Sequence, residues 1–386
     1  MPWREQSVTD QRREFVALAM APGANMRELC RRFGISRSNG YKWLQRYLSG
    51  GHAGLSDRSR RPLRSPGRTP ASVETEVLRI RSNSNNAWGG RKIAKVMEKA
   101  GHVEVPAAST ITEILRRAGK LDEHKERHPG PHQRFERASP NELWQMDFKG
   151  HFPMVQGRCH PLTVLDDHSR FSLTVSACGN EQERTARARL VPVFRLYGLP
   201  FSMLMDNGPP WGDPRGQAHT GFTVWLMQIG IQVIHGRPLH PQTQGKDERF
   251  HRTLKAELLN GRAFRNLLEC QHAFDRWRHI YNHERPHEAL GLVTPAERYC
   301  ASTRAFPERL SPIEYGPGDT IRKVDINGRI VVEGRRFFVG SAFRGHPLAL
   351  RPTLEDGVFS IHFCAYQIGI LDLRGPGPQQ QQHSLQ

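Results

Sequence analysis

The chain has 386 residues, which at roughly 100–200 residues per domain implies two to four domains. Hydrophobic residues make up 37% of it, and no apolar run approaches the roughly 18 residues of a spanning helix, so we expect neither a membrane partner nor export. The formal net charge is +18 and is concentrated in the first 140 residues, which favours a nucleic-acid-binding region joined to a more balanced domain over a generically basic protein.

Residues 1–50 are predicted to form a helix-turn-helix domain. A first helix covers 11–20, and Asn25, with Glu28 three residues later, is expected to cap a second helix. Ser36 then caps a third helix, which runs almost to the end of the domain. Two short helices joined by a tight turn are typical of DNA-binding proteins, with an ordinary helical hairpin as the alternative. The last helix would present its polar residues to DNA, namely Arg37, Ser38, Lys42, Gln45 and Arg46.

Two linkers flank a second helical block. Residues 51–72 are rich in Gly, Ser, Pro and Arg and have no apolar period to bury, so they are read as a basic linker. Its arginines are expected to follow the DNA phosphates, namely Arg58, Arg60, Arg61, Arg64 and Arg68. Residues 73–120 are predicted to form a second DNA-binding domain, in which Arg91 and Lys92 are candidate contacts. Its helices are expected at 73–81, 91–99 and 109–117, and a further linker follows at 121–140.

The pattern changes between residues 141 and 300, where strand-like segments alternate with helical ones. Strands are expected at 143–148, 160–165, 171–175, 201–206 and 231–234, and helices at 183–196, 221–229, 245–259 and 263–281. Antiparallel strands followed by helices and parallel strands predict a mixed five-stranded sheet covered by helices. Residues 315–374 carry short alternating strands, which predict a small β-barrel, and 375–386 is expected to be a disordered tail.

Two carboxylates stand near the ends of strands. Alternation along the strand at 143–148 places Asp147 on the face of Gln145, opposite the large apolar residues. An unpaired Asp on a half-buried strand is costly, so Asp147 needs a partner or a cation. Asp206 ends a later strand, where α/β folds commonly form their sites, although a turn-initiating Asp is an equal alternative.

The helix at 245–259 carries a third candidate. Its spacing places Glu248, Arg252 and Lys255 on one face, nearly opposite an apolar stripe. This would direct one carboxylate and two cations into a cleft, with a surface Glu–Arg pair as the alternative. Asp247 lies about 100° round the helix from Glu248, so both carboxylates cannot point the same way, and Asp247 is expected to face away from the cleft.

Three carboxylates that converge on one point suit phosphoryl transfer assisted by a divalent cation. Mg²⁺ prefers oxygen ligands and keeps water, so a few carboxylates and a substrate phosphate complete its shell. Two such ions can activate the attacking oxygen and stabilise the leaving one. The chain has neither the glycine-rich loop of an ATPase nor a Cys-His spacing for zinc. Its six scattered cysteines indicate reduced thiols in a cytoplasmic protein.

Five motifs occur in the order found in one known family. They are Trp-Gln-Met-Asp at 144–147, Leu-Asp-Asp-His-Ser-Arg at 165–170, Asp-Asn-Gly at 206–208, His-Pro-Gln-Thr-Gln-Gly-Lys-Asp-Glu-Arg at 240–249 and Tyr-Asn-His-Glu-Arg-Pro-His at 281–287. With these motifs, and with Trp-Gly-Gly-Arg-Lys-Ile at 88–93, the chain resembles the integrase-type transposases of bacterial insertion sequences over most of its first 300 residues.

The resemblance implies a retroviral-integrase-like core with a ribonuclease-H-like α/β fold at 141–300. The family's Asp-Asp-Glu set falls on Asp147, Asp206 and Glu248. These residues would be both catalytic and ligands of Mg²⁺ or Mn²⁺, with two ions expected. Lys255 matches a position that lies close to the DNA ends in the family, and Arg252 is a further candidate contact. The carboxylates of the hairpin motif, Asp166 and Asp167, are expected to be structural rather than ligands.

By the same resemblance, the protein binds the terminal inverted repeats of its own element as double-stranded DNA, cuts there and joins the 3′-hydroxyl to target DNA. Joining needs two DNA ends, so a homodimer or a higher homo-oligomer is expected, in the bacterial cytoplasm at the nucleoid. Two alternatives stay open. One is a catalytically inactive, transposase-derived DNA-binding regulator, and the other is a structure-selective nuclease without strand transfer.

The sequence departs from related patterns in two places. Asp206 and Glu248 are 42 positions apart, which exceeds the usual interval of the family by about two helical turns. The surplus is expected in an outward-bulging loop at 211–217. The N-terminus lacks the His-His-Cys-Cys zinc pattern of retroviral integrases, so no zinc is expected.

Overall fold

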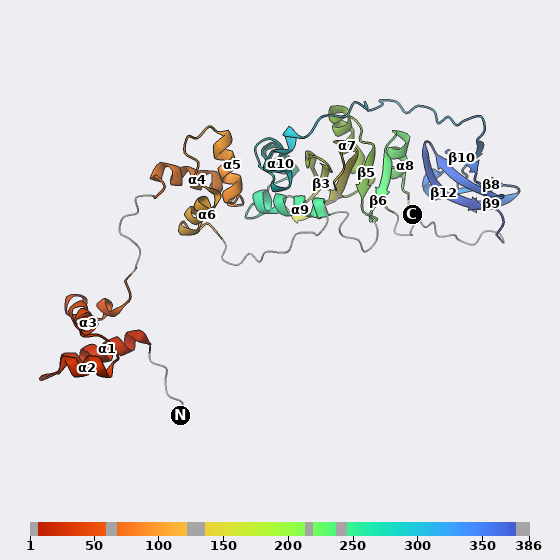
Figure 1. The fold of residues 1–386 in the computed structure, drawn as a ribbon. Helices are drawn as coiled ribbons and strands as arrows, with labels where there is room; N and C mark the ends of the chain where they lie inside the picture. The colour runs from red at the N-terminus through yellow and green to blue at the C-terminus, as the bar shows by residue number, and fades with distance from the viewer. Residues whose placement is uncertain (1–6, 59–67, 122–135, 213–218, 237–244, 376–386) are drawn as a thin grey trace. The chain divides into compact units, whose positions relative to one another are not determined.

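The structure is a computed structural model that describes residues 7–58, 68–121, 136–212, 219–236 and 245–375 (Figure 1). These residues fall into two compact units, Met1–Arg68 and Thr69–Gln386. None of the helices in the described ranges is both long and apolar enough to span a bilayer. Several expectations concern residues outside the described ranges, namely those for Arg60, Arg61, Arg64, most of the linker at 121–140, the loop at 213–217 and the tail at 376–386.

The first unit is a small helical domain. Helix α1 covers Val8–Ala19, α2 covers Met26–Arg32, α3 covers Arg37–Gly50, and a short 3₁₀ helix follows at Gly51–Leu55. Both expected N-caps are confirmed, because the side chains of Asn25 and Ser36 accept hydrogen bonds from backbone N–H groups of α2 and α3. Gly40 lets α3 pass close to α2, since a Cβ there would lie 2.5 Å from Cys30 Sγ.

The second helical block has its own apolar core. It consists of α4 (Ala71–Asn83), α5 (Gly90–Lys99) and α6 (Ala108–Arg117), as predicted. The buried residues of this core are Val77, Ile80, Trp88, Ile93, Met97, Ile111, Ile114 and Leu115. Gly90 allows α5 to begin against α6, because a Cβ there would lie 2.2 Å from the Ala108 carbonyl oxygen. Ile280 of helix α10 (Leu267–His283) packs on this core, so the block is joined to the next domain.

A mixed sheet forms the centre of the third domain. Its strands are β1 (Leu143–Phe148), β3 (Arg158–Asp166), β4 (Ser172–Cys178), β5 (Ser202–Met205) and β6 (Gln232–His235). β4 pairs antiparallel with β3, and β3 with β1, whereas β1, β5 and β6 run parallel. These strands confirm the predicted mixed sheet. The two-residue strand β2 (Phe152–Pro153), beside β3, was not expected.

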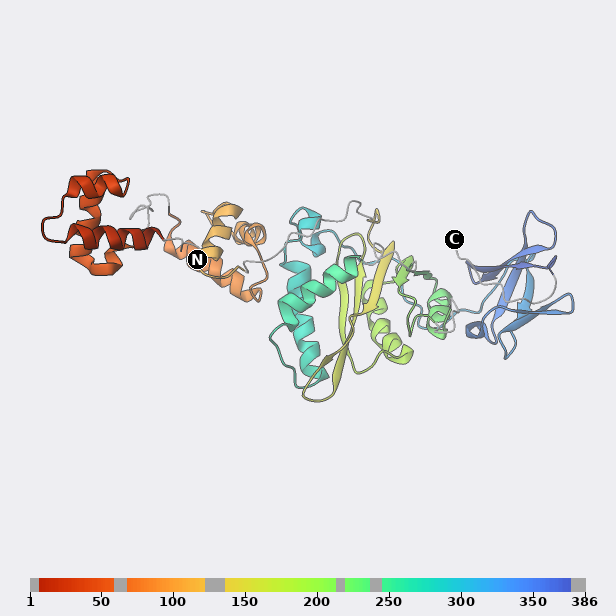
Figure 2. The same ribbon diagram turned by 90° about the horizontal axis from the view of Figure 1, so that it is seen from below.

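Helices cover both faces of this sheet. The helices α7 (Glu183–Tyr197) and α8 (Gly221–Gln228) pack on the face that carries Trp144 and Met146. The opposite face is covered by α9 (Gly245–Leu254) and α10. Figure 2 shows the sheet between the teal pair α9–α10 and the yellow-green α7. Because side chains alternate along a strand, Asp147 points to the face covered by α9.

Two helices near the site differ from the expected ranges. The helix expected at 245–259 is α9 followed by a π-helical turn at Lys255–Leu259. Helix α10 begins at Leu267, later than expected, because the Asn266 side chain caps it by accepting a hydrogen bond from the Glu269 N–H.

The C-terminal strands form an open sheet and a hairpin. Strands β7 (Thr320–Lys323), β10 (Pro347–Pro352), β11 (Val358–Phe363) and β12 (Tyr366–Asp372) pair in the order β12-β11-β10-β7. The strands β8 (Arg329–Val332) and β9 (Arg335–Phe338) pair only with each other. Ile330 and Leu348 share one core with Val224 of α8. The expected closed barrel is not seen among the described strands, because no hydrogen-bonded ladder joins the hairpin to the sheet.

Candidate active site

Asp147 on β1 lies level with Asp206, the first residue after the adjacent parallel strand β5. The register of β1 and β5 pairs Gln145 with Leu204, two residues before the carboxylates, and the same offset aligns Asp147 with Asp206. Met205 belongs to the core on the α7 face, so Asp206, like Asp147, points to the face covered by α9. The strand pattern therefore brings two of the three expected carboxylates together.

Burial and like charge disfavour ionisation of both carboxyl groups. The side chain of Asp147 is 28% exposed, and its pKa is raised to about 7, first by burial and then by the charge of Asp206. Burial also raises the pKa of Asp206, and the charge of Glu181 adds to the rise at both residues. The Gly208 N–H opposes this rise by donating to Asp206 Oδ1 at 3.2 Å. Two such carboxylates favour a bound cation.

His251 connects α9 to the strand that carries Asp147. Its Nε2 lies 2.8 Å from Thr163 Oγ1, and that hydroxyl donates to the Asp147 carbonyl oxygen at 3.0 Å. His251 Nδ1 lies 3.9 Å from Asp147 Oδ2. Burial lowers the pKa of His251 to about 4, so the ring is neutral at neutral pH. His251 was not expected at the site; it lies four residues after Asp247 and therefore shares that residue's face of α9.

The first turn of α9 directs Asp247 inward and leaves Glu248 exposed. Asp247 is only 3% exposed, and its pKa is raised well above the usual range by burial and by the charges of Asp147 and Asp167. The two side chains do point differently, as predicted, but the expectation that Asp247 faces away from the cleft is wrong. It precedes Phe250 by three residues and therefore belongs to the apolar stripe that packs on the sheet.

Glu248 is not gathered with the other two carboxylates. No hydrogen bond or ion pair to a described residue holds its side chain. Across the described ranges, no three His, Cys, Asp or Glu side chains lie close enough together to hold a metal ion. The structure thus unites Asp147 with Asp206 and places Glu248 on the first turn of the helix that covers them.

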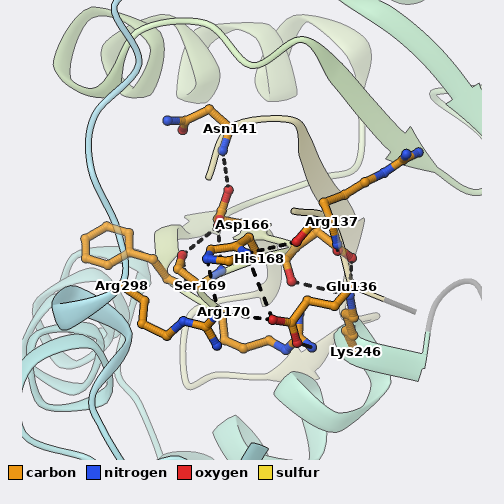
Figure 3. Close-up of polar contacts among 11 residues, drawn as sticks. Glu136, Arg137, Asn141, Asp166, His168, Ser169, Arg170, Lys246 and Arg298 are labelled. Carbon is orange, nitrogen blue, oxygen red and sulfur yellow. Dashed lines mark hydrogen bonds and ion pairs between the residues drawn. The ribbon is translucent and has the colours of Figure 1, made fainter. Parts of the chain in front are cut away.

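The Asp-Asp-His-Ser-Arg segment between β3 and β4 forms a buried hydrogen-bond network (Figure 3). Asp166 accepts hydrogen bonds from the Ser169 N–H at 2.8 Å, the Ser169 hydroxyl at 2.6 Å and the Asn141 N–H at 2.7 Å. Arg170 takes a positive φ of 62°, and its N–H donates to the Asp166 carbonyl oxygen at 3.0 Å. One Asp166 carboxylate oxygen is thus used within the turn, and the other binds the Asn141 backbone just before β1.

Asp167 joins three segments of the chain. Its Oδ1 accepts from Gln145 Nε2 on β1 at 2.7 Å, and its Oδ2 accepts from the Arg137 N–H at 2.9 Å. Lys246, in the first turn of α9, forms an ion pair with the same carboxylate. The ammonium of Lys246 also donates to the Asp167 carbonyl oxygen at 3.3 Å. One buried carboxylate therefore binds the sheet, the segment that enters the core and the start of α9.

The segment that enters the core makes further contacts with this hairpin. Glu136 forms ion pairs with Arg170 at 3.2 Å and with Arg298 at 3.3 Å. His168 Nδ1 lies 2.8 Å from the Arg137 carbonyl oxygen. Figure 3 shows these side chains around the hairpin, next to Lys246.

Most of the DNA-contact candidates in the first unit lie on its surface. The exposed ones are Arg37, Ser38, Lys42, Gln45 and Arg58. Arg46 is half-buried instead, because its guanidinium lies 4.6 Å from the centre of the Trp43 ring and donates to the Ser56 carbonyl oxygen at 2.7 Å. Arg46 is thus engaged within its own domain.

Three of the remaining DNA-contact candidates are exposed, and one is half-buried against the core domain. Arg252 and Lys255 are exposed on α9 and the turn that follows it. Arg91 is exposed and lies 3.6 Å from Glu288. Lys92 is half-buried, and its pKa is lowered to about 8 by burial and then by the charge of Arg285. Lys92 therefore faces the core domain.

Glu257 is a buried carboxylate that the sequence pattern did not indicate. Its side chain is 5% exposed and accepts from Arg285 Nε at 2.8 Å. It also accepts from the indole N–H groups of Trp88 at 3.1 Å and Trp277 at 3.2 Å. The motifs around Trp88 and Arg285 thus meet at this carboxylate, which attaches the second helical block to the turn after α9.

Comparison with known domains reproduces this organisation. Two models described as integrase core domain match residues 137–241 and 229–295. A helix-turn-helix domain matches 11–62, and a homeodomain-like domain matches 39–115. The C-terminal domain of the IS481 family transposases matches 319–379. The chain therefore carries DNA-binding domain types before an integrase core.

Curated relatives come from bacterial insertion elements. An uncharacterized 39.2 kDa protein of IS476 from Xanthomonas euvesicatoria is 28% identical over 179 residues, 46% of this chain and 49% of that protein, so the chain spans about half the length of this relative. An uncharacterized 31.7 kDa protein of IS407 from Burkholderia multivorans is 26% identical over 60% of this chain and 83% of that protein.

Solved structures include the HTLV-2 integrase catalytic core domain in complex with magnesium (trimeric form). It is 20% identical, with a TM-score of 0.32, over 42% of this chain and 97% of that one. The integrase core matches and the insertion-element relatives, rather than this structural likeness, identify the chain as a member of the integrase-type transposases of bacterial insertion sequences.

Proposed function

We propose that the chain is a DNA transposase that binds the terminal inverted repeats of an insertion sequence and catalyses metal-dependent cleavage and strand transfer there. Asp147, Asp206 and Glu248 are its proposed catalytic residues. The observation that carries the proposal is the alignment of Asp147 on β1 with Asp206 at the end of the adjacent parallel strand β5, on the sheet face that α9 covers. The two integrase core matches support it, because together they span all three residues.

The groups at this site fit a hard divalent cation. Asp147 and Asp206 supply oxygen ligands, and their raised pKa values reflect a need for positive charge nearby. The buried Oδ1 of Asp247 has no hydrogen-bond partner among the described residues. The site therefore contains another carboxylate oxygen that a cation could stabilise. Mg²⁺ and Mn²⁺ suit such oxygen sets, and two bound ions would activate an attacking oxygen and stabilise the leaving one.

The residues of the chain would act by position and charge. In this proposal Asp147 and Asp206 hold the metal ions on the sheet, and Glu248 completes the ligand set from α9. Arg252 and Lys255, which follow Glu248 at helical spacing and are exposed, bind the phosphates of the DNA end. Such a reaction needs placement and charge neutralisation, without a covalent intermediate on the protein.

Recognition of the repeat is assigned to the first unit. The exposed side chains of α3, Arg37 and Lys42 among them, would read base edges, whereas basic linker residues such as Arg58 would follow phosphates without regard to sequence. Strand transfer joins two ends to one target, so the proposed active form is a homodimer or a higher homo-oligomer on DNA.

The test is cleavage of a labelled element end by the full-length protein in Mg²⁺. Asp147→Asn, Asp206→Asn and Glu248→Gln keep the side-chain shape and remove the charge that a metal ligand needs. Each should abolish cleavage and strand transfer and leave binding to the end unchanged. Asp275→Asn, on the exposed side of α10, is the matched control and should cleave as the wild type does.

Three outcomes would contradict parts of this proposal. An inactive Asp247→Asn beside an active Glu248→Gln would move the third catalytic position to the buried neighbour. Normal cleavage by all the variants would remove the metal site. Tight and selective end binding by a wild-type protein that never cleaves would favour the inactive regulator.

A further inference from the structure

Lys246 lies two residues before Glu248, and its side chain is turned into the protein. The side chain is 17% exposed and forms an ion pair with the carboxylate of Asp167, which is 5% exposed. Its ammonium also donates to the Asp167 carbonyl oxygen at 3.3 Å. Lys246 thus ties the first turn of α9 to the hairpin between β3 and β4, as Figure 3 shows.

Asp167 is a well-fixed partner for this lysine. Its backbone N–H donates to the Leu143 carbonyl oxygen at 2.9 Å. Its carboxylate also accepts from Gln145 Nε2 at 2.7 Å and from the Arg137 N–H at 2.9 Å. Leu143 and Gln145 lie on β1, the strand that carries Asp147. The ion pair therefore fixes the start of α9 relative to β1, the strand that carries Asp147.

A lysine in this place has two energetic costs. The N-terminus of a helix carries partial positive charge, so a cation in the first turn is unfavourable. Burial of an ammonium is also unfavourable unless it is paired and hydrogen-bonded. The neighbouring basic residue Arg249 avoids the cost of burial, because its side chain is exposed. The inward position of Lys246 is explained by its contact with Asp167.

Glu248 depends on the backbone of this turn for its position. Its exposed side chain has no hydrogen bond or ion pair to a residue in the described ranges. Phe250 and Leu254 pack α9 on the sheet, but both lie after Glu248 in the helix. Among the residues of α9 that precede Glu248, Lys246 is the one whose side chain forms an ion pair with another segment.

We propose that Lys246 is a positioning residue for Glu248: its ion pair with Asp167 fixes the first turn of α9, and with it the backbone of Glu248, relative to β1. This inference rests on the proposed function, because it gives Glu248 a role at the metal site. In this proposal, the Lys-Asp-Glu sequence at 246–248 and Asp167 of the hairpin motif act together to place Glu248. Asp167 itself acts as the support and is no ligand.

The first test measures Mn²⁺ binding to the DNA-free, full-length protein by titration calorimetry. Lys246→Met should weaken Mn²⁺ binding by about tenfold, as loss of outer-shell support does elsewhere. Plain electrostatics predicts the opposite sign, because removal of a nearby cation strengthens binding of another cation. Lys246→Arg keeps charge and reach and should retain most of the affinity. Arg249→Met removes an exposed cation from the same turn and should not weaken binding.

The second test measures single-turnover cleavage of a bound, labelled end. Lys246→Met should slow cleavage about 10–100-fold and leave the Kd for the end unchanged, with partial rescue by Lys246→Arg. Asp167→Asn should slow cleavage in the same way. The double variant should be no slower than the slower single variant, because both changes remove one ion pair. Multiplicative losses in the double variant would overturn the proposal.

Failure of this inference is distinguishable from failure of the proposed function. A wild-type protein that does not cleave, or an active Asp147→Asn, would refute the proposed function. Normal Mn²⁺ affinity and cleavage in Lys246→Met, with Asp147→Asn inactive, would refute only the positioning role. If Lys246→Met lowers the thermal midpoint, Asp167→Asn at an unchanged midpoint decides the question, and normal Mn²⁺ affinity in that variant overturns the inference.

Discussion

In the metal-free protein, Asp147→Asn should raise the free energy of unfolding near pH 7.5. The pKa of Asp147 is raised to about 7 by burial and by the charge of Asp206, whereas an Asp in an unfolded chain has a pKa of about 3.9. Ionisation therefore costs more free energy in the folded protein than in the unfolded chain. Asn has nearly the same shape and no charge, so the variant avoids this cost.

The magnitude follows from the difference between the two pKa values. A rise from about 3.9 to about 7 corresponds to about 4 kcal/mol, and solvent screening of a side chain that is 28% exposed makes this an upper limit. Because the folded-state pKa is the higher one, the folded protein binds more protons than the unfolded chain between the two values. The contribution of Asp147 to stability is fully present below about pH 4 and is lost as the pH rises to about 7. The advantage of the variant should therefore be small near pH 4 and largest above pH 7.

The assay is thermal unfolding of both proteins in EDTA at several pH values. A stabilisation of 1 kcal/mol raises the midpoint of a domain of this size by about 2–4 °C, so a difference of several degrees is expected at pH 7.5. Asp275→Asn, on the surface of α10, should leave the midpoint unchanged at every pH. Added Mn²⁺ should stabilise the wild type more than Asp147→Asn. A lower midpoint for Asp147→Asn at pH 7.5, or a difference that does not vary with pH, would refute the reasoning.

Three further predictions concern other parts of the chain. Glu257→Ala should lower the free energy of unfolding by about 3–5 kcal/mol in a urea titration, because it leaves the charge of Arg285 buried without its partner. Replacing both Arg37 and Lys42 by Ala should weaken repeat binding and lower the preference for the repeat over random DNA, because these side chains are assigned to base edges, and equal wild-type affinity for repeats and random DNA at every salt concentration would contradict the recognition role. Thiol reagents should label Cys300 first, because it is the exposed one of the six cysteines, and labelling should leave metal-dependent cleavage unchanged.

Features that depend on near neighbours in the chain were predictable from the sequence. Asn25 and Ser36 cap their helices because a cap bonds to backbone groups two or three residues away. Alternation along β1 separates Asp147 from Trp144 correctly, because side-chain direction in a strand depends only on its period of two. The strand positions and the mixed character of the core sheet were predictable from the same kind of pattern.

Features that depend on which surfaces meet were not predictable in the same way. Asp247 was expected to face away from the cleft, but its spacing of three from Phe250 places it on the packed side of α9. This spacing was visible in the sequence. A charged residue is nevertheless expected at the surface until the side chains that pack around it are known. Glu257 and Lys92 lie between domains, and no periodicity reveals a contact between segments so far apart.

Cut mapping on element DNA by the full-length wild-type protein tests the central claim most directly. The proposal predicts cleavage at the end of the terminal repeat that leaves a 3′-hydroxyl, requires Mg²⁺ or Mn²⁺, stops in EDTA and is followed by joining of that end to target DNA. Selective binding to the repeat without any cut in Mg²⁺ or Mn²⁺, or an undiminished cut in EDTA after exhaustive dialysis, would contradict it.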